Sequence, residues 1–153
     1  MDLITKADDL LASVYGPRGV GAVGLIVQGG KTIFRRAYGL ADLELEVPMA
    51  ADMVFGIGSV TKDFTAAAIM MLADERMLSY EDLLIKHLPD CPPQWDGVTL
   101  DNLLAHTSGI PDLFSVPAYR AQLGMEVTPK GLVEMVKDRP LQFGPGTSVA
   151  YSN

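Results

Sequence analysis

The chain has 153 residues and a formal net charge of −7, from 12 lysines and arginines against 19 aspartates and glutamates. This acidity argues against binding to nucleic acids or anionic membranes, since both depend on clustered basic residues. The single cysteine excludes a disulfide within the chain. Hydrophobic residues make up 48% of the sequence, which is high for a soluble chain and predicts that some apolar surface awaits a partner.

Two elements are predicted in the first part of the chain. Hydrophobic residues recur at helical spacing from Leu3 to Val14 and predict an amphipathic helix that ends before Gly16. Residues 22–28 and 31–39, joined by two glycines, predict a β-hairpin, and residues 41–48 read as irregular. A lone two-stranded sheet is marginal in water, so this sheet is expected to need further strands or packed helices.

A third element is predicted after Gly56-Ile57-Gly58. Residues 64–77 are apolar on nearly every side. A helix without a polar stripe belongs in a protein interior, so we expect this helix to be buried.

Three shorter helices are predicted from their capping residues, and they span 79–88, 99–105 and 128 to just before Pro140. Ser79 with Asp82 resembles a capping box at the first of these. Residues 89–97, which are rich in proline, read as a loop.

The Ser59-Val60-Thr61-Lys62 sequence at the start of the third element carries the first chemical signal. Residues three apart lie on one helix face, which places the Lys62 amine beside the Ser59 hydroxyl. A lysine in a dry pocket can act as a base toward serine, and a helix N-terminus favours a developing oxyanion. On this segment alone an ordinary helix start, with Ser59 as N-cap and Lys62 solvated, is equally good.

The last residues of the chain carry the second signal. A Gly-Pro-Gly turn at 144–146 precedes Tyr151 and Asn153. Near a lysine cation the Tyr151 phenol should have a lowered pKa and could serve as a general base. The Asn153 amide both donates and accepts hydrogen bonds, so it could orient a carbonyl group or a lysine. Without Ser59 and Lys62, these two residues would read as ordinary turn residues.

Taken together, three ordered motifs resemble the beta-lactamase-related serine hydrolases, which include class C beta-lactamases, D-alanyl-D-alanine carboxypeptidases and family VIII-type esterases. The motifs are residues 55–62, residues 106–111, and Pro145-Gly146-Thr147 with Tyr151-Ser152-Asn153. The resemblance covers most of the chain, from about Val23 to Asn153.

The resemblance implies a role for each matching residue. Ser59 would be the acylated nucleophile, and its backbone N–H would be one donor of the oxyanion hole. Lys62 and Tyr151 would share the proton transfer, with the acylation base left open between them. Asn153 would bind substrate and brace Lys62.

The second motif, His-Thr-Ser-Gly, is expected to have a structural role. The resemblance implies that His106, Ser108 and Gly109 form a structural loop, as in proteins of this family. His106 is expected to form local bonds rather than to act on substrate.

The fold implied is an α/β (α+β) beta-lactamase/transpeptidase-like domain, with an antiparallel sheet flanked by helices and a helical region. Residues 1–55 would give a helix and one hairpin of the sheet layer, and residues 56–153 the helical region. The family also has a later Lys/His-x-Gly strand that supplies the second oxyanion donor. That strand is expected to lie outside these residues, which would make the chain an N-terminal portion.

Two functional hypotheses follow. In the first, the chain bears the nucleophile of a serine hydrolase acting on small-molecule esters, beta-lactams or D-amino-acid peptides, with little activity by itself. In the second, it is a non-catalytic interaction module or half of a split enzyme. The expected macromolecular partners are accordingly a missing C-terminal half or a second copy of the chain, with no nucleic acid and no membrane.

No cofactor or metal is expected. His87, Cys91 and His106 lack metal-ligand spacing. The Gly-Gly-Lys-Thr stretch at 29–32 departs from the phosphate-binding loop at Leu25 and is followed by a predicted strand. The first 15 residues do not resemble a signal peptide, which predicts a cytoplasmic location, or a periplasmic or secreted one if a signal has been removed.

Overall fold

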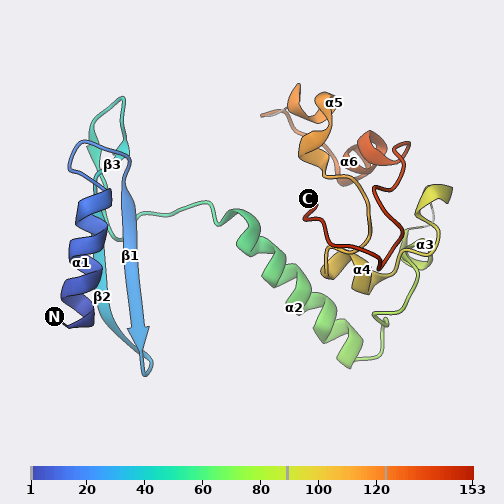
Figure 1. Ribbon diagram of the computed structural model, residues 1–153, viewed down its shortest axis with the longest axis horizontal. Helices are drawn as coiled ribbons and strands as arrows, with labels where there is room; N and C mark the ends of the chain where they lie inside the picture. The colour runs from blue at the N-terminus through green and yellow to red at the C-terminus, as the bar shows by residue number, and fades with distance from the viewer. Residues whose placement is uncertain (1, 89, 123) are drawn as a thin grey trace. The chain divides into compact units, whose positions relative to one another are not determined.

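The computed structural model describes residues 2–88, 90–122 and 124–153, and the chain forms two compact units, Met1–Ile57 and Gly58–Asn153 (Figure 1). Each unit is described by itself. The structure mixes helices with short antiparallel sheets, as the predicted fold class requires. The assignment of residues 1–55 and 56–153 to a sheet layer and a helical region stays a prediction.

The first unit packs one helix against a hairpin. Helix α1, Leu3–Val14, begins where the Asp2 side chain accepts a hydrogen bond from the Thr5 amide at 2.9 Å. Strands β1, Ala22–Gln28, and β2, Lys31–Tyr38, pair antiparallel. Both turn glycines have positive φ angles (56° and 74°), which a tight hairpin turn of this kind requires. The predicted helix and hairpin are confirmed.

Polar contacts fix α1 on the hairpin. The Tyr38 hydroxyl donates to Asp8 at 2.6 Å, and Arg36 pairs with the same carboxylate. Burial and the bond to Asp8 raise the pKa of Tyr38 to about 12, so the phenol stays protonated as a donor. Phe34 is buried in this unit.

The prediction of an irregular stretch over 41–48 is wrong. Strand β3, Leu40–Asp42, pairs antiparallel with β4, Val47–Pro48, in a second small sheet. The intervening turn is closed by the Asp42 side chain, which accepts from the amides of Glu44 and Leu45 at 2.9 and 2.8 Å. Such a side-chain-closed turn leaves little periodic signal, which is why the hydrophobic pattern did not indicate it.

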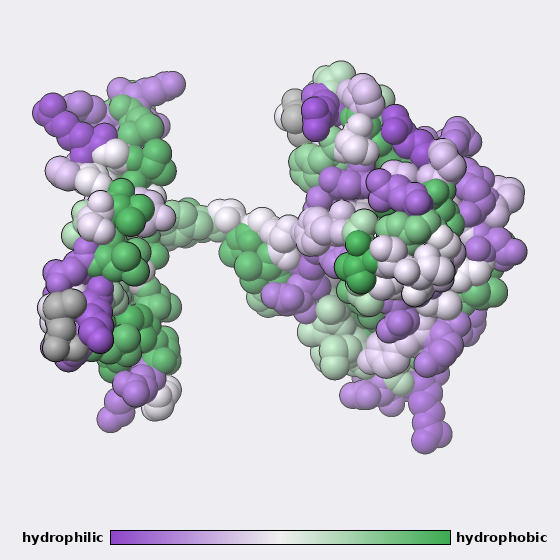
Figure 2. All heavy atoms as spheres, in the orientation of Figure 1, coloured by the Kyte–Doolittle hydropathy of each residue, from purple (hydrophilic) through white to green (hydrophobic). Residues whose placement is uncertain are grey.

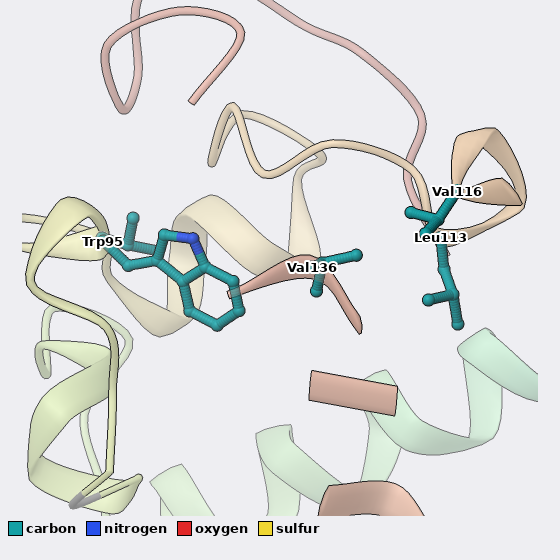
Figure 3. Packing of buried hydrophobic residues seen from close by; sticks show 5 residues of the cluster. Trp95, Leu113, Val116 and Val136 are labelled. Carbon is teal, nitrogen blue, oxygen red and sulfur yellow. The ribbon is translucent and has the colours of Figure 1, made fainter. Parts of the chain in front are cut away.

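The second unit consists of short helices around a small core. Its helices are α2, Thr61–Asp74; α3, Leu84–His87; α4, Leu100–Leu104; α5, Pro117–Arg120; and α6, Pro129–Val136. Short 3₁₀ turns lie at Gly58–Val60, Pro93–Trp95 and Leu113–Ser115. The buried cluster is formed by Trp95, Val98, Leu113, Val116 and Val136 (Figure 3).

Two of the predicted capped helices form as expected. Thr99 accepts from the Asn102 amide while the Asn102 side chain accepts from the Thr99 amide, which completes a capping box at α4. Thr128 caps α6 by accepting from the Gly131 amide, and Pro129 occupies the first turn.

The capping box proposed for Ser79 and Asp82 forms only in part. The Ser79 amide donates to Asp82 at 3.0 Å, but the Ser79 hydroxyl contacts Glu81, and the helix begins at Leu84. Asp82 also accepts from Lys86 and His87. The Lys86 bond, followed by those from the Ser79 amide and His87, lowers the pKa of Asp82. The predicted loop at 89–97 has its first residue outside the described ranges, and its remainder contains the 3₁₀ turn that buries Trp95.

The expectation that the third element is a buried helix is wrong for this chain. No residue of α2 is buried over its described length, and Phe64 and Met71 are 67% and 66% exposed. Residues 58–153 do not supply enough apolar neighbours to cover a helix that is hydrophobic on all sides. Figure 2 shows hydrophobic side chains at the surface of each unit. Within the described ranges, the helices are too short or too polar to cross a lipid bilayer.

Candidate active site

The start of α2 holds the candidate nucleophile. Gly58 has a φ of 52°, a left-handed conformation that suits glycine, and Ser59 follows in a 3₁₀ turn. Among the described residues at this helix start, Val60 occupies the N-cap position and has no capping side-chain bond. The Ser59 hydroxyl therefore does not cap the helix and is directed to other partners.

Those partners are Tyr151 and Lys62. The Ser59 Oγ lies 2.5 Å from the Tyr151 hydroxyl, and the Lys62 Nζ donates to the same Oγ at 3.4 Å. Lys62 also donates to the Asn153 Oδ1 at 2.7 Å and lies 5.0 Å from the centre of the Tyr151 ring. The structure thus brings together the four residues that the sequence indicated at its two distant motifs.

The loop containing His-Thr-Ser-Gly holds the C-terminal segment in this position. The carbonyl groups of His106, Thr107 and Gly109 accept from the amides of Ala150, Gly146 and Gln142 at 3.0, 2.8 and 2.8 Å. This ladder of backbone bonds fixes the path of residues 142–150.

His106 and Ser108, which lie in this loop, make further contacts. The His106 Nδ1 accepts from the Ser152 amide at 3.3 Å, and its ring lies 4.5 Å from the Tyr151 ring. Ser108 is buried, and its hydroxyl accepts from the Ile110 amide at 3.2 Å. The Ser108 bond is local, but the His106 ring bonds to Ser152, 46 positions away, so the expectation that His106 bonds locally is wrong. The structural role of this loop stays a prediction. The catalytic and substrate-binding roles of Ser59, Lys62, Tyr151 and Asn153 stay predictions.

One residue of the site was missed by the sequence reasoning. Asp112 accepts through Oδ1 from both the Asn153 amide, at 2.9 Å, and the Asn153 side-chain Nδ2, at 3.1 Å. Its only signal was its position directly after the 106–111 motif, which by itself does not indicate a partner 41 residues away.

The neighbours of Tyr151 lower the pKa of its phenol. The Lys62 ammonium, and then the Ser59 hydrogen bond, lower the pKa of Tyr151. Burial raises the pKa of Asp112, but hydrogen bonds from Asn153 and from the Phe114 amide, with the positive charge of Lys62, leave that pKa lowered. The Lys62 ammonium, the Tyr151 phenol with its lowered pKa, and the Asp112 carboxylate therefore belong to one network of contacts.

A hollow of about 270 Å³ opens beside this network. Its lining includes Asn153 and Ser152 at one side and the apolar side chains of Ile110, Leu132 and Val136. A space of this size, with mostly apolar walls and a few polar groups, can take a small organic group.

Other reactive residues do not form a site. Across the described ranges, histidine, cysteine and acidic side chains do not gather in groups of three that could hold a metal ion. Burial, and then Asp96, raises the pKa of Cys91, which makes its thiol a poor nucleophile.

Replacing Lys62 by methionine should raise the pKa of Tyr151. Lys62 is the largest cause of the lowering, and methionine keeps similar bulk without the positive charge. The measurement is a pH titration of ¹³Cζ-labelled tyrosine by NMR, with the Tyr151 signal assigned from the Tyr151→Phe spectrum. Lys130→Met, on α6 and exposed, serves as the control that should leave this titration unchanged. A Tyr151 titration that does not move in Lys62→Met would show that the two side chains do not interact.

The chain is similar to known proteins over most of its length. Residues 8–153 match the family described as Beta-lactamase. The chain is 34% identical to esterase EstB of Burkholderia gladioli over 147 residues, which cover 87% of this chain and 38% of that protein.

Two solved structures show the same fold. The chain is similar to a D-stereospecific amidohydrolase from Streptomyces sp., with a TM-score of 0.82, 28% identity, and coverage of 99% of this chain and 46% of that one. It is also similar to the octameric penicillin-binding protein homologue from Pyrococcus abyssi, with a TM-score of 0.80, 28% identity, and coverage of 99% and 36%. The chain spans between 27% and 38% of the length of the first curated relatives it matches. The match over residues 8–153 shows that this chain belongs to the beta-lactamase family.

Proposed function

We propose that this chain supplies the nucleophile of a serine hydrolase that forms an acyl-enzyme on Ser59. The observation that carries the proposal is the contact of the Ser59 hydroxyl with Tyr151 at 2.5 Å and with Lys62 at 3.4 Å. A serine hydroxyl is a weak nucleophile unless a base takes its proton, and here two candidate bases adjoin it.

The proposed reaction has two steps. The Ser59 Oγ attacks the carbonyl carbon of the substrate while its proton moves to Tyr151 or Lys62, the two groups that contact this oxygen. The backbone N–H of Ser59 donates to the oxyanion of the tetrahedral intermediate. The intermediate then releases the leaving group, which takes up a proton, and water hydrolyses the remaining ester on Ser59.

The proposed substrates are small esters, beta-lactams or D-amino-acid peptides. The names of the similar proteins, an esterase, a D-stereospecific amidohydrolase and a penicillin-binding protein homologue, support this range of carbonyl compounds. The apolar hollow beside Asn153 supports a substrate that carries a small apolar group next to its carbonyl.

A second candidate is that residues 1–153 form half of an enzyme that needs a second polypeptide, or a non-catalytic interaction module. The apolar surface of α2, which has no buried residue over its described length, favours a partner that covers it. A second copy of the chain is a further proposed partner, which the octameric assembly named for the Pyrococcus abyssi homologue supports. A cytoplasmic location stays a prediction.

Covalent labelling separates the two candidates. The chain is treated with a fluorophosphonate and with a chromogenic cephalosporin, its intact mass is measured, and the modified residue is located by peptide mapping. We expect a single fluorophosphonate adduct on Ser59, with little turnover of a chromogenic ester. Turnover should be low because the resemblance assigns the second oxyanion donor to a later strand. A heat-denatured sample is the control and should not be labelled. Adducts at other residues, or none, would count against the nucleophile and favour the second candidate.

A further inference from the structure

Asp112 lies at one end of a chain of hydrogen bonds that runs through Asn153 and Lys62 to Ser59. Its Oδ1 accepts from the backbone amide and from the side-chain Nδ2 of Asn153, at 2.9 and 3.1 Å. The Oδ1 of the same Asn153 side chain accepts from the Lys62 Nζ at 2.7 Å. The two ends of one carboxamide are therefore held by a carboxylate and an ammonium.

This arrangement fixes which way the amide faces. A carboxylate only accepts hydrogen bonds and an ammonium only donates them. If the Asn153 amide were rotated by half a turn, its oxygen would face the Asp112 carboxylate and its NH₂ group would face the Lys62 ammonium. Both contacts would then be repulsive, so the chemistry of Asp112 and Lys62 selects a single orientation.

We propose that Asp112 is a positioning residue, which holds the backbone and side chain of Asn153 so that the amide oxygen keeps the Lys62 amine against Ser59 and Tyr151. The inference deepens the proposed function, because it concerns the amine that would share the serine proton. Asp112 acts through Asn153 and has no direct contact with Ser59 among the described bonds.

The protonation state of Asp112 is compatible with this role. The Asn153 hydrogen bonds, with a contribution from the Lys62 charge, overcome the effect of burial and lower the pKa of the carboxyl. Asp112 is thus ionised at neutral pH, and it accepts two bonds through one oxygen. The charged or titratable side chains in this network are Lys62, Tyr151 and Asp112 itself, with His106 adjoining Tyr151.

The charge of Asp112 and its proposed positioning of Lys62 have opposite effects on the pKa of Tyr151, so the two effects can be measured separately. The negative charge of Asp112 raises the pKa of Tyr151, whereas the Lys62 amine that Asp112 helps to hold lowers it. Asp112→Asn removes the charge but keeps an oxygen that accepts from Asn153. Asp112→Ala removes both the charge and the acceptor. The difference between these two variants therefore reports the positioning effect.

The test is the pKa of Tyr151, measured by NMR titration of ¹³Cζ-labelled tyrosine in the native chain and in three variants. In Asp112→Asn the pKa should fall below its native value, because the unfavourable charge is gone. In Asp112→Ala it should lie above the value in Asp112→Asn, because Lys62 is no longer held. In Asn153→Ala, which keeps Asp112 and loses the amide, it should rise above the native value.

Equal Tyr151 pKa values in the two Asp112 variants, or an unchanged value in Asn153→Ala, would overturn the proposal. Fluorescence of Trp95, the single tryptophan, gives the thermal midpoint of each variant and identifies one that fails to fold. Asn153→Ala probes the same contact from the other side if Asp112→Ala is unfolded. Because the titration does not depend on turnover, its result is independent of whether Ser59 proves to be the nucleophile.

Discussion

Ser59→Ala is expected to abolish the covalent adduct with a fluorophosphonate and to lower any hydrolysis of a chromogenic ester by roughly 10³-fold or more. The reason is chemical: the other groups of the site move protons, but the oxygen that forms the acyl bond belongs to Ser59. Intact-mass kinetics measure the adduct, and absorbance measures the ester.

Ser152→Ala is the matched control for this experiment. Ser152 directly precedes the proposed substrate-binding Asn153 and lines the same hollow. It should keep the adduct at close to the native rate. The assignment of Ser59 would be wrong if labelling and hydrolysis persisted in Ser59→Ala or were lost instead in Ser152→Ala.

The pKa of Tyr151 gives a second measurement on Ser59→Ala. The Ser59 hydroxyl is the second cause of the lowered pKa of Tyr151, after Lys62. The pKa of Tyr151 should therefore rise in Ser59→Ala, and by less than it rises in Lys62→Met. The opposite order would mean that the hydrogen bond between Ser59 and Tyr151 has a larger effect on the pKa of Tyr151 than Lys62 has.

Gly109→Ala is expected to lower the free energy of unfolding of the chain substantially. Gly109 has a φ of 76°, and a Cβ at this position would lie 2.2 Å from the carbonyl oxygen of Phe143. The left-handed conformation costs alanine about 1–2 kcal/mol, and overpacking against a fixed group costs about 1–3 kcal/mol more. A total of about 3 kcal/mol corresponds to a fall in the thermal midpoint of about 6–12 °C for a chain of this length.

The chain provides a matched control for the backbone part of this effect. Gly97 has a similar φ of 81°, but a Cβ there would meet no atom within 4 Å. Gly97→Ala should therefore cost only the free energy of the left-handed backbone conformation, about 1 kcal/mol. This corresponds to a fall in the thermal midpoint of about 2–4 °C. The fluorescence of Trp95 reports both transitions. Equal midpoints in the two variants would contradict the close approach of Gly109 to Phe143.

The consequence of Gly109→Ala for the site is also testable. The Gly109 carbonyl accepts from the Gln142 amide at 2.8 Å, in the same ladder that fixes the segment leading to Tyr151. If alanine pushes this segment away, the lowering of the Tyr151 pKa should be lost at temperatures where the chain is still folded. The variant would then link the supporting loop to the chemistry of the phenol.

Local features of the fold were predictable from the sequence. The hairpin follows from two strand-like segments and a Gly-Gly turn, and α4 and α6 follow from Thr99 and Thr128 at their starts. In each case the deciding interaction joins residues a few positions apart. The burial of α2 could not be predicted in the same way, because burial depends on what other segments lie nearby rather than on the helix itself.

The sequence by itself determined the family and the start of the helix that follows the serine, and it predicted Ser59, Lys62, Tyr151 and Asn153 as site residues. Only the tertiary structure decided that these side chains converge, since the bonds of Ser59 to Tyr151 and of Lys62 to Asn153 span 92 and 91 positions. It also decided the part played by Asp112, whose contacts with Asn153 span 41 positions. The physical reason is that chain distance does not fix spatial distance. A ladder of backbone hydrogen bonds from the His106–Gly109 loop to residues 142–150 brings these segments together. Because almost every residue has the same backbone donor and acceptor, such bonds cannot be predicted from the identities of the side chains.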